Sequence, residues 1–524
     1  FQSSGPNKST TKQSERRKRR KPMFKLFGPP GTGKTTALLD LVDKALRDGT
    51  PPNKIAFLAF TRKAAQEAKD RASERFFLDK KTDLANFRTL HSFALSRTAI
   101  PASEIMSEKH YFELGQRIGV KLGRTKNIDL FEDGGDFSPS ADPILALINL
   151  ARLRRVSLRA EYNASDLSVE WNTVKYVSTA LDRYKRGMHL YDFTDMLEEF
   201  VANASTACPH LDLCLLDEAQ DLSALQWELA HALDLRAKRM FVAGDDDQAI
   251  YSFAGASVEH FLSLDAPAET LSQSYRVPRA VHELAEKVVA RIPHRFPKKY
   301  LPRSDKGSVQ RVSDVSQVNM THGSWLILAQ AGYMLQTCAL ELRAIGLLFN
   351  FCGQRSIPAA VSEAVNAWER CRKGLEITGL QARAIYRFMS PSRIKAGHKR
   401  VKGLSDTACT DYEGLVKNHG LVAQRNMIWS TAMDKLLERD RAYVTAMLRR
   451  GESFNAAPRI DVSTIHAAKG GEADNVVVLT DLSPAADTTE GQPDIHRLFY
   501  VAFTRCKQNL FLVEADNFNR AYVV

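Results

Sequence analysis

The chain has no long hydrophobic run and no surplus of negative charge. Its 524 residues contain no stretch of about 18 or more consecutive apolar residues, so we expect no membrane-spanning helix. No N-terminal signal-peptide pattern is present either. The 73 Lys and Arg residues outnumber the 61 Asp and Glu residues, and the formal net charge is +12. A basic surplus suits a polyanionic partner such as nucleic acid, although general solubility explains it equally well.

Paired cysteines and internal repeats are also missing. The seven cysteines are scattered without a Cys-x-x-Cys pair, so the sequence shows neither a zinc-site pattern nor a disulfide framework. We therefore expect reduced thiols in a cytoplasmic protein. The chain is too long for a single hydrophobic core, and several lobes are expected.

An α/β pattern occurs in two parts of the chain. In each part, apolar runs of strand length alternate with helical periodicity, and a more polar helical stretch interrupts them. The first 22 residues stand apart because they combine a linker-like start with a basic run, and Met23 fits a native start. The predicted order is a linker, tag or disordered basic segment (1–22), a first α/β lobe (23–95 and 190–268) with a helical insertion (96–189), and a second lobe (269–370 and 459–524) with a short helical insertion (371–458).

A phosphate-binding loop follows the first predicted strand. Residues 28–35, Gly-Pro-Pro-Gly-Thr-Gly-Lys-Thr, match the pattern Gly-x4-Gly-Lys-[Ser/Thr], with a strand at 24–27 and a helix at about 35–46. Gly28, Gly31 and Gly33 allow backbone N–H groups to turn towards phosphates. We expect Lys34 to pair with the β- and γ-phosphates and Thr35 to ligate Mg²⁺.

Two further apolar runs end abruptly at carboxylates and amides. Residues 211–217 lead into Asp217-Glu218-Ala-Gln-Asp, and residues 239–244 lead into Asp-Asp-Asp-Gln248. Buried parallel strands have this character, and ligands bind at their carboxyl ends. We expect Asp217 to hold Mg²⁺, Glu218 to orient or deprotonate the attacking water, and Gln248 to contact the γ-phosphate. The alternative, an exposed acidic turn, fits poorly because Asp217 directly follows Leu-Cys-Leu-Leu.

These acidic segments resemble motifs II and III of superfamily 1A helicases of the UvrD/Rep/PcrA type. Further signatures of that family occur in the expected order, and the resemblance runs from about Phe24 to Glu514. The segments that resemble motifs Ia, Ib, the re-entry segment and motifs IV, V and VI are 59–65, 89–92, 192–197, 273–276, 464–472 and 500–505.

The resemblance implies a fold and a site. The fold is a pair of RecA-like parallel-sheet lobes with helical insertions, the 1A/1B/2A/2B arrangement, and ATP and Mg²⁺ lie between the lobes. Arg276 and Arg505 would act as arginine fingers on the transferring phosphoryl group. Tyr275 would stack on adenine and Glu472 would accept from the ribose. Without the family, either arginine could form a surface salt bridge.

The resemblance also implies a track for single-stranded DNA. Aromatic rings in this family stack on bases, and neighbouring polar residues lie near the DNA backbone. Without the family resemblance, each aromatic residue fits a protein core, and each histidine fits a capping or core position. The residues at the matching positions are Phe60, Thr61, Arg62, His91, Phe193, Tyr251, Phe253, Thr464 and His466.

Several positions depart from the family pattern. Thr36, counted with the nucleotide-binding residues, stands where an arginine often follows the phosphate loop, so base selectivity could be relaxed. The glutamine motif that contacts adenine is missing or degenerate; only Gln13 has roughly suitable spacing. Pro29-Pro30 resembles superfamily 1B, whose members move with opposite polarity, but the other motifs favour 3′→5′ movement. The insertion at 371–458 has about half the usual length, so the prediction of strand separation is less secure than the prediction of translocation.

The leading hypothesis is therefore an ATP-dependent DNA helicase that moves 3′→5′ on single-stranded DNA and unwinds duplex at ss/ds junctions. The alternative is a single-strand-dependent ATPase that strips or remodels protein–DNA complexes without processive unwinding. A scaffold with an inactive phosphate loop is disfavoured because every expected catalytic side chain is present. We expect a monomer during translocation, replication or repair proteins as partners, and the cytoplasm of a bacterial or phage-infected cell.

Overall fold

The computed structural model describes residues 23–122, 142–484 and 493–524. The predictions for residues 1–22, including Gln13, fall outside these ranges. Within them, none of the helices combines the length and apolar character that crossing a bilayer requires.

The first sheet has six strands in the order β3-β2-β4-β5-β1-β6, and all its pairings are parallel. β2 and β4 are buried along their whole length, as expected for strands covered on both faces. β1 and β5 are neighbours in a register that pairs Phe27 with Gly244, so the phosphate loop and both acidic segments leave the same edge of the sheet. The strands are β1 (Phe24–Phe27), β2 (Ile55–Ala59), β3 (Phe87–Thr89), β4 (Leu213–Leu216), β5 (Met240–Gly244) and β6 (Ala268–Thr270).

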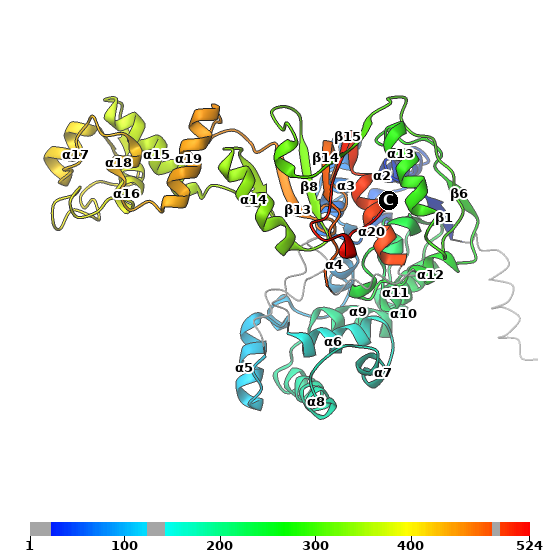
Figure 1. Cartoon of the computed structure of the whole chain (residues 1–524). Coiled ribbons are helices and arrows are strands. Elements are labelled where there is room, and N and C mark those ends of the chain that lie inside the picture. Colours follow the sequence, from blue (N-terminus) through cyan, green and yellow to red (C-terminus); the bar gives the residue numbers. More distant parts are fainter. Residues whose placement is uncertain (1–22, 123–141, 485–492) are drawn as a thin grey trace, which may run out of the picture.

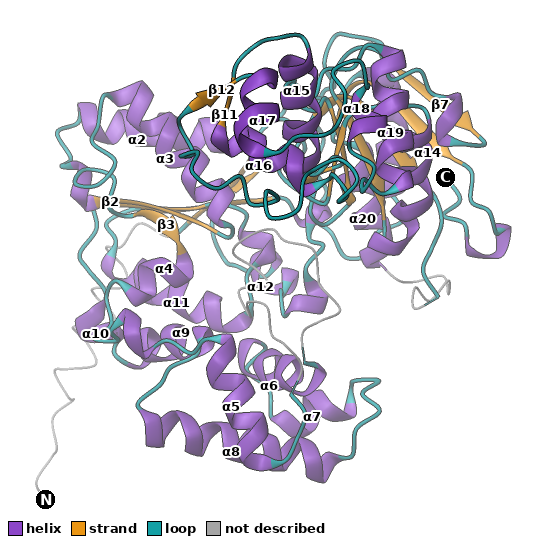
Figure 2. Ribbon diagram, turned by 90° about the vertical axis from the view of Figure 1, so that its left-hand side faces the viewer, coloured by secondary structure: helices purple, strands orange, loops and turns teal. Residues whose placement is uncertain are grey.

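Helices cover both faces of this sheet (Figure 2). On one face α2 and α3 bury Leu38, Val42 and Ala68 against Phe57 and Leu215. A larger core lies on the other face of the sheet. Helices α4 and α9 cover this face and pack against each other. The helices of this lobe are α2 (Lys34–Arg47), α3 (Arg62–Phe76), α4 (Leu90–Leu95), α9 (Phe193–Ala202), α10 (Ala204–Ala207), α11 (Ala224–Arg236) and α12 (Val258–Leu262).

The second sheet has seven strands in the order β10-β9-β13-β8-β14-β15-β7, and its pairings are parallel except that of β9 with β10. The predicted α/β class, with two mostly parallel sheets, is thus confirmed. The strands are β7 (Ser308–Val312), β8 (Trp325–Ala329), β9 (Phe349–Phe351), β10 (Gln354–Arg355), β13 (Ile460–Thr464), β14 (Ala473–Leu479) and β15 (Cys506–Val513).

One hydrophobic core joins the two sheets. Phe27 and Trp227 of the first lobe belong to the same buried cluster as Phe499 and Leu510 of the second. Helices α13 (Arg279–Val289) and α20 (Pro493–Phe503) pack together in this shared region, whereas α14 (Leu335–Ala344) packs on the opposite face of the second sheet. Part of the space between the lobes is therefore filled by a shared hydrophobic core.

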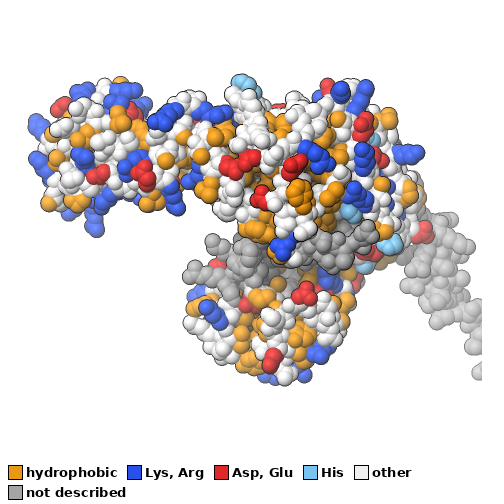
Figure 3. Space-filling model, viewed as in Figure 1, with side chains coloured by type: hydrophobic (Ala, Val, Ile, Leu, Met, Phe, Trp, Pro, Cys, Tyr) orange, Lys and Arg blue, Asp and Glu red, His pale blue; other side chains and the backbone are white. Residues whose placement is uncertain are grey.

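Two groups of helices project from the sheets (Figure 1). The first has its own core, which includes Leu114, Ile148 and Leu181. It consists of α5 (Glu108–Ile118), α6 (Pro143–Leu153), α7 (Leu158–Asn163) and α8 (Trp171–Met188). The second forms an arm, and Lys and Arg side chains are spread along it (Figure 3). The arm consists of α15 (Ala359–Arg372), α16 (Gly379–Arg387), α17 (Tyr412–His419), α18 (Trp429–Ala432), α19 (Glu438–Arg450) and the antiparallel pair β11 (Ile377–Thr378) and β12 (Cys409–Thr410).

The predicted start of the second insertion, between residues 370 and 371, falls inside α15. The buried Trp368 of this helix donates from Nε1 to the Met427 carbonyl at 2.9 Å, so α15 packs as part of the arm. The arm therefore begins about one helix earlier in the chain than the sequence pattern indicated.

Candidate nucleotide site and nucleic-acid track

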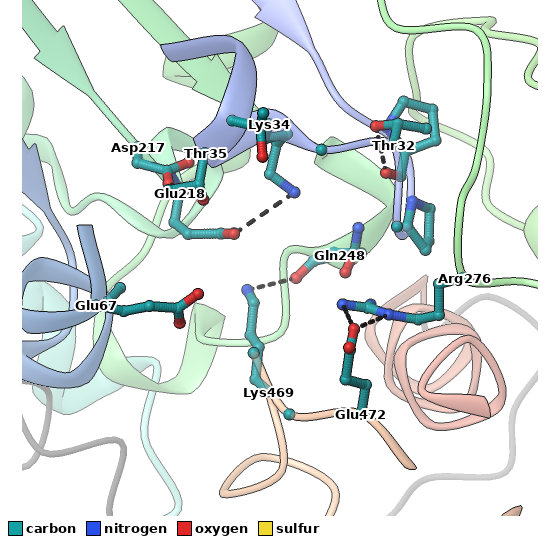
Figure 4. Close-up of a pocket in the computed structure, with 18 of the residues that line it drawn as sticks. Thr32, Lys34, Thr35, Glu67, Asp217, Glu218, Gln248, Arg276, Lys469 and Glu472 are labelled. Atoms are coloured by element: carbon teal, nitrogen blue, oxygen red, sulfur yellow. Dashed lines mark hydrogen bonds and ion pairs between the residues drawn. The ribbon is translucent and has the colours of Figure 1, made fainter. Parts of the chain in front are cut away.

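A cavity of about 440 Å³ opens between the two sheets (Figure 4). Its walls come from both lobes and include most of the residues predicted for the nucleotide. The first lobe contributes 29–36, Ala64, Glu67, Arg71, Asp217, Glu218 and Gln248, and the second contributes Arg276, 469–472 and Arg505.

The phosphate loop depends on its glycines. Gly31 and Gly33 have φ values of +71° and +80°, in the left-handed region that favours glycine. At Gly28, an added Cβ would lie 1.9 Å from Lys34 Cγ, so no larger residue fits beside the lysine. Lys34 is the first residue of α2 and donates from Nζ to the Gly28 carbonyl at 3.1 Å. The start of α2 thus offers N–H groups and a cation to an anion in the cavity.

The second lobe is hydrogen-bonded to this loop. Ser274 Oγ donates to the Pro30 carbonyl at 2.7 Å, and the Tyr275 N–H donates to the Gly31 carbonyl at 2.9 Å. An added Cβ on Gly31 would lie 2.4 Å from Arg276 Cβ. The approach of these two segments therefore requires glycine at position 31. Tyr275 is 72% exposed and does not line the cavity, so an adenine stacked on its ring would lie outside this cavity.

Oxygen atoms suited to Mg²⁺ lie together at the end of β4. Thr35 Oγ1 donates to Asp217 Oδ2 at 3.1 Å, and the Glu218 N–H donates to Asp217 Oδ1 at 2.9 Å. A hydroxyl and a carboxylate on adjacent elements are the hard ligands that Mg²⁺ takes beside a phosphate. Burial and the neighbouring Glu218 carboxylate raise the pKa of Asp217, so a cation at this position would be favoured.

Glu218 is held ionised beside Lys34. Burial raises the pKa of Glu218, but the ammonium groups of Lys34 and Lys469 outweigh it and keep that pKa below its ordinary value. Lys34 Nζ lies 3.5 Å from Glu218 Oε1, and Gln220 donates to Oε2 at 2.6 Å. The Glu218 backbone has a φ of +55°, a strained conformation for a residue with a side chain. A carboxylate that is fixed and ionised in this way can accept a hydrogen bond from a water and orient it.

Arg505 reaches from the second lobe to Gln248 of the first. Its Nη2 donates to Gln248 Oε1 at 2.7 Å, and its Nε donates to the Val501 carbonyl at 3.0 Å. The side chain is buried. Burial, together with the positive charge of Arg276, lowers the pKa of Arg505 to about 9, so it stays protonated at neutral pH. This contact joins a residue at the end of β5 to one directly before β15.

Lys469 makes a second contact between the lobes, and the sequence assigned it no role. Its Nζ donates to the Gln248 carbonyl at 2.7 Å and forms an ion pair with Asp221. Burial raises the pKa of Asp221 to about 7 although Lys469 opposes the shift. The lysine lies within the segment that resembles motif V, so its position in the motif was the available signal.

Arg276 and Glu472 occupy the opposite wall of the cavity (Figure 4). Arg276 donates to Glu472 Oε2 from Nε at 2.7 Å and approaches the same oxygen with Nη2 at 2.6 Å. Lys507 Nζ lies 2.7 Å from the other oxygen of Glu472. The carboxylate predicted to bind the ribose is therefore shared between two cations. Thr36, across the cavity, accepts from Arg71 Nη2 at 2.8 Å, so an arginine of α3 is present beside this threonine.

Residues 9–269 match the UvrD/REP helicase N-terminal domain, and residues 430–517 match the UvrD-like helicase C-terminal domain. The chain belongs to the UvrD/REP family of superfamily 1 helicases. The resemblance predicted from its motifs is thus confirmed.

The curated relatives are distant and longer. The chain is 26% identical over 290 residues to the ATP-dependent DNA helicase PcrA of Leuconostoc citreum, which is 53% of this chain and 38% of that protein. It is 26% identical over 314 residues to PcrA of Staphylococcus aureus, or 56% of this chain and 41% of that protein. A probable DNA helicase of Mycoplasma pneumoniae is 27% identical over 296 residues, 51% and 53% of the two chains. The matched region spans between about two fifths and half of these relatives.

In this UvrD/REP-family chain, four of the predicted DNA-contacting residues form one aromatic cluster between the lobes. The Tyr251 ring lies 5.4 Å from Phe60 and 6.0 Å from Phe253, and the Phe253 ring lies 5.0 Å from His466 of the second lobe. Phe60 and Tyr251 are buried, whereas Phe253 is 37% exposed. Phe253 is therefore the ring of this cluster that is most open to a base.

The other predicted track residues lie at or near the ends of helices and strands. Thr61 caps α3 by accepting from the Ala64 N–H at 3.1 Å, and the exposed Arg62 is the first residue of that helix. Thr464, the last residue of β13, is buried and accepts from the Ala467 N–H at 3.3 Å. The remaining two residues are the buried His91 in α4 and the half-buried Phe193, which begins α9.

Proposed function

We propose that the chain is an ATP-dependent DNA helicase that moves 3′→5′ on single-stranded DNA and hydrolyses ATP between two RecA-like lobes. The observation that carries the proposal is the contact of Arg505 with Gln248, because it sets a buried guanidinium of one lobe against the predicted γ-phosphate contact of the other. An arginine brought to the phosphates by a second lobe is the arrangement that makes hydrolysis depend on the relative position of two bodies.

The cavity residues would have different roles in hydrolysis. Lys34 and the N–H groups at the start of α2 would hold the phosphates, and Glu218 would orient or deprotonate the attacking water. Thr35 and Asp217 would hold Mg²⁺, which supplies charge neutralisation on the β- and γ-phosphates when bound. Arg276 and Arg505 would stabilise the charge that develops during transfer.

A short path connects this chemistry to the aromatic cluster. Lys469 Nζ, which donates to the Gln248 carbonyl, lies 5.0 Å from the centre of the Tyr251 ring. Tyr251 Oη also donates to the His466 carbonyl at 3.2 Å. A change in the contacts of Gln248 on hydrolysis would therefore reach two rings of the DNA track through one lysine. Such a connection supports the coupling of ATP turnover to base release and capture.

The deciding experiment measures ATPase activity with and without single-stranded DNA, followed by unwinding of duplexes with a 3′ or a 5′ single-stranded tail. We expect strong stimulation by single-stranded DNA and unwinding from the 3′ tail alone. DNA binding should weaken steeply with salt because phosphate contacts release counterions. ATPase activity that is indifferent to nucleic acid would contradict the proposal, and unwinding from the 5′ tail would reverse the polarity.

A second candidate is an ATPase that translocates on single strands to strip or remodel protein–DNA complexes without processive unwinding. The compact arm favours it, since α15–α19 with one two-stranded sheet make up the whole second insertion between β10 and β13. ATP-driven displacement of a bound protein from single-stranded DNA, without separation of a tailed duplex, would support this candidate over the first. In either case we propose a monomer acting at single strands or ss/ds junctions, with replication or repair proteins as partners.

A further inference from the structure

Three consecutive carboxylates are fully buried beside the nucleotide cavity. The side chains of Asp245, Asp246 and Asp247 follow β5 and lie close enough together to hold a metal ion. Lys298 occupies that position instead. Its Nζ lies 3.0 Å from Asp245, 2.6 Å from Asp246 and 2.6 Å from Asp247, and its side chain is 1% exposed. This lysine lies outside all the segments that resemble helicase motifs.

One oxygen of Asp245 faces Lys298, and the other faces the nucleotide site. Gln248 donates from Nε2 to Asp245 Oδ2 at 2.6 Å, and its Oε1 accepts from Arg505 at 2.7 Å. An amide placed between a carboxylate and a guanidinium has one favourable orientation, with nitrogen towards the acid and oxygen towards the cation. Lys298 therefore holds the acid that orients Gln248.

Asp245 is also connected to Glu218. The Asp245 N–H donates to Gln220 Oε1 at 3.0 Å, and Gln220 Nε2 donates to Glu218 Oε2 at 2.6 Å. Two residues of the proposed hydrolytic machinery, Gln248 and Glu218, are thus positioned from one buried aspartate. The ammonium of Lys298 compensates the negative charge of the buried Asp245 carboxylate and so holds this side chain in place.

Lys298 belongs to the segment that joins α13 to β7. This segment is anchored to the second lobe, because Arg497 of α20 donates to the His294 carbonyl at 2.9 Å. It also packs on the first lobe, where Phe296 stacks on Phe27 with ring centres 4.1 Å apart. The Lys298 side chain is therefore positioned by the interface between the lobes, and its Nζ lies 5.8 Å from the centre of the Phe27 ring at the end of β1.

We propose that Lys298 is a positioning residue for ATP hydrolysis, which acts through Asp245 to fix the amide of Gln248. The inference rests on the proposed function and deepens it, because it adds a contact between the lobes that senses their arrangement without touching the nucleotide. Loss of the ammonium should lower kcat and leave nucleotide binding nearly unchanged.

The test compares Lys298→Met with Arg295→Met. Arg295 lies in the same segment and pairs with Asp247 through two contacts of 2.7 Å, but it does not contact Asp245, so it is a matched control for loss of charge from the cluster. We expect Lys298→Met to lower the DNA-stimulated kcat about tenfold or more, with KM for ATP within about twofold of the parent. Arg295→Met should retain a kcat close to that of the parent. Lys298→Arg should recover part of the loss.

A double-mutant cycle with Gln248→Ala decides whether the effect passes through the amide. In the Gln248→Ala background, Lys298→Met should cost little further activity. Full additivity, equal losses in Lys298→Met and Arg295→Met, or an unchanged kcat would each overturn the proposal.

A crystal structure of the Lys298→Met protein supplies a readout other than activity. The Gln248–Asp245 hydrogen bond should be lost or rotated, and its retention would refute the positioning role even if the variant were unstable in solution. This measurement also separates the two proposals. A parent protein without DNA-stimulated ATPase would remove the helicase function, whereas the Lys298 contact would still stand or fall on the orientation of Gln248.

Discussion

Replacement of Arg505 should separate catalysis from stability. The guanidinium is buried, and its lowered pKa, about 9, means that the folded protein holds the charge at a cost of about 1.4 kcal/mol for each unit by which the pKa falls. This cost is present in full below pH 9 and is relieved as the pH rises through that value, because the folded state binds this proton less tightly than the unfolded state. Arg505→Met removes the charge and retains much of the volume.

We expect Arg505→Met to lower kcat by about 10³-fold, the effect of losing an arginine finger. Its midpoint of thermal unfolding should stay close to that of the parent, because the costly buried charge is removed together with its hydrogen bonds to Gln248 and to the carbonyls of Val501 and Gly471, each worth about 1.5–3 kcal/mol. The assays are steady-state ATPase with saturating single-stranded DNA and calorimetry without nucleotide. Arg505→Lys retains a cation and should recover little activity, because the lysine lacks the planar fork.

Two results would refute this reasoning. ATPase activity within about threefold of the parent would show that the guanidinium does not reach the phosphates. A fall of more than about 10 °C in the unfolding midpoint, together with lost activity, would assign Arg505 a structural role instead.

Four further predictions follow from the site. Gly28→Ala should abolish nucleotide binding in an equilibrium assay with a fluorescent ATP analogue, since a Cβ would lie 1.9 Å from Lys34 Cγ; binding of normal affinity would contradict this view of the loop. Lys469→Met should lower both basal ATPase activity and the fold stimulation by single-stranded DNA, because it breaks the contact between Gln248 and the Tyr251 ring; unchanged stimulation would disprove the path. Phe253→Ala should weaken binding of single-stranded DNA by about 1–3 kcal/mol in fluorescence anisotropy, the contribution of one stacked base, whereas the exposed Phe518 provides a control substitution without effect. Asp221→Asn should flatten the pH dependence of the free energy of unfolding. The raised pKa of Asp221, about 7, makes the folded state bind this proton more tightly than the unfolded state, so the parent loses stability relative to the variant as the pH rises from about 4 to 7. The same pH dependence in the two proteins across this range would exclude the shift.

The catalytic half of the site could be predicted from the sequence because buried parallel strands are recognisable as apolar runs. The run at 24–27 is β1 at its observed bounds, and the runs that end at Asp217 and at 244 contain β4 and β5. The residues at such strand ends converge in space once the strands are neighbours, and no long-range information is needed to place Lys34 near Asp217.

Edge strands and contacts between lobes could not be predicted in the same way. β6 is largely exposed and no residue of β7 is fully buried, so neither strand has a buried apolar run to mark it. The start of the arm was misplaced because α15 is an ordinary amphipathic helix whose partner, Met427, lies 59 residues away. Lys298 stands 52 residues from Asp246, and nothing in its local sequence distinguishes it from an exposed lysine.

The hydrogen bonds between the phosphate loop and residues 274–275 limit how the molecule can open. Where these bonds persist while the two sheets separate, Gly31 stays against Arg276, and the relative rotation of the sheets takes place about this point. Displacements are then smallest beside the loop and grow with distance from it. The tip of the arm lies at the far end of this lever, so a rotation too small to be seen at the cavity would sweep the arm through the largest path in the molecule.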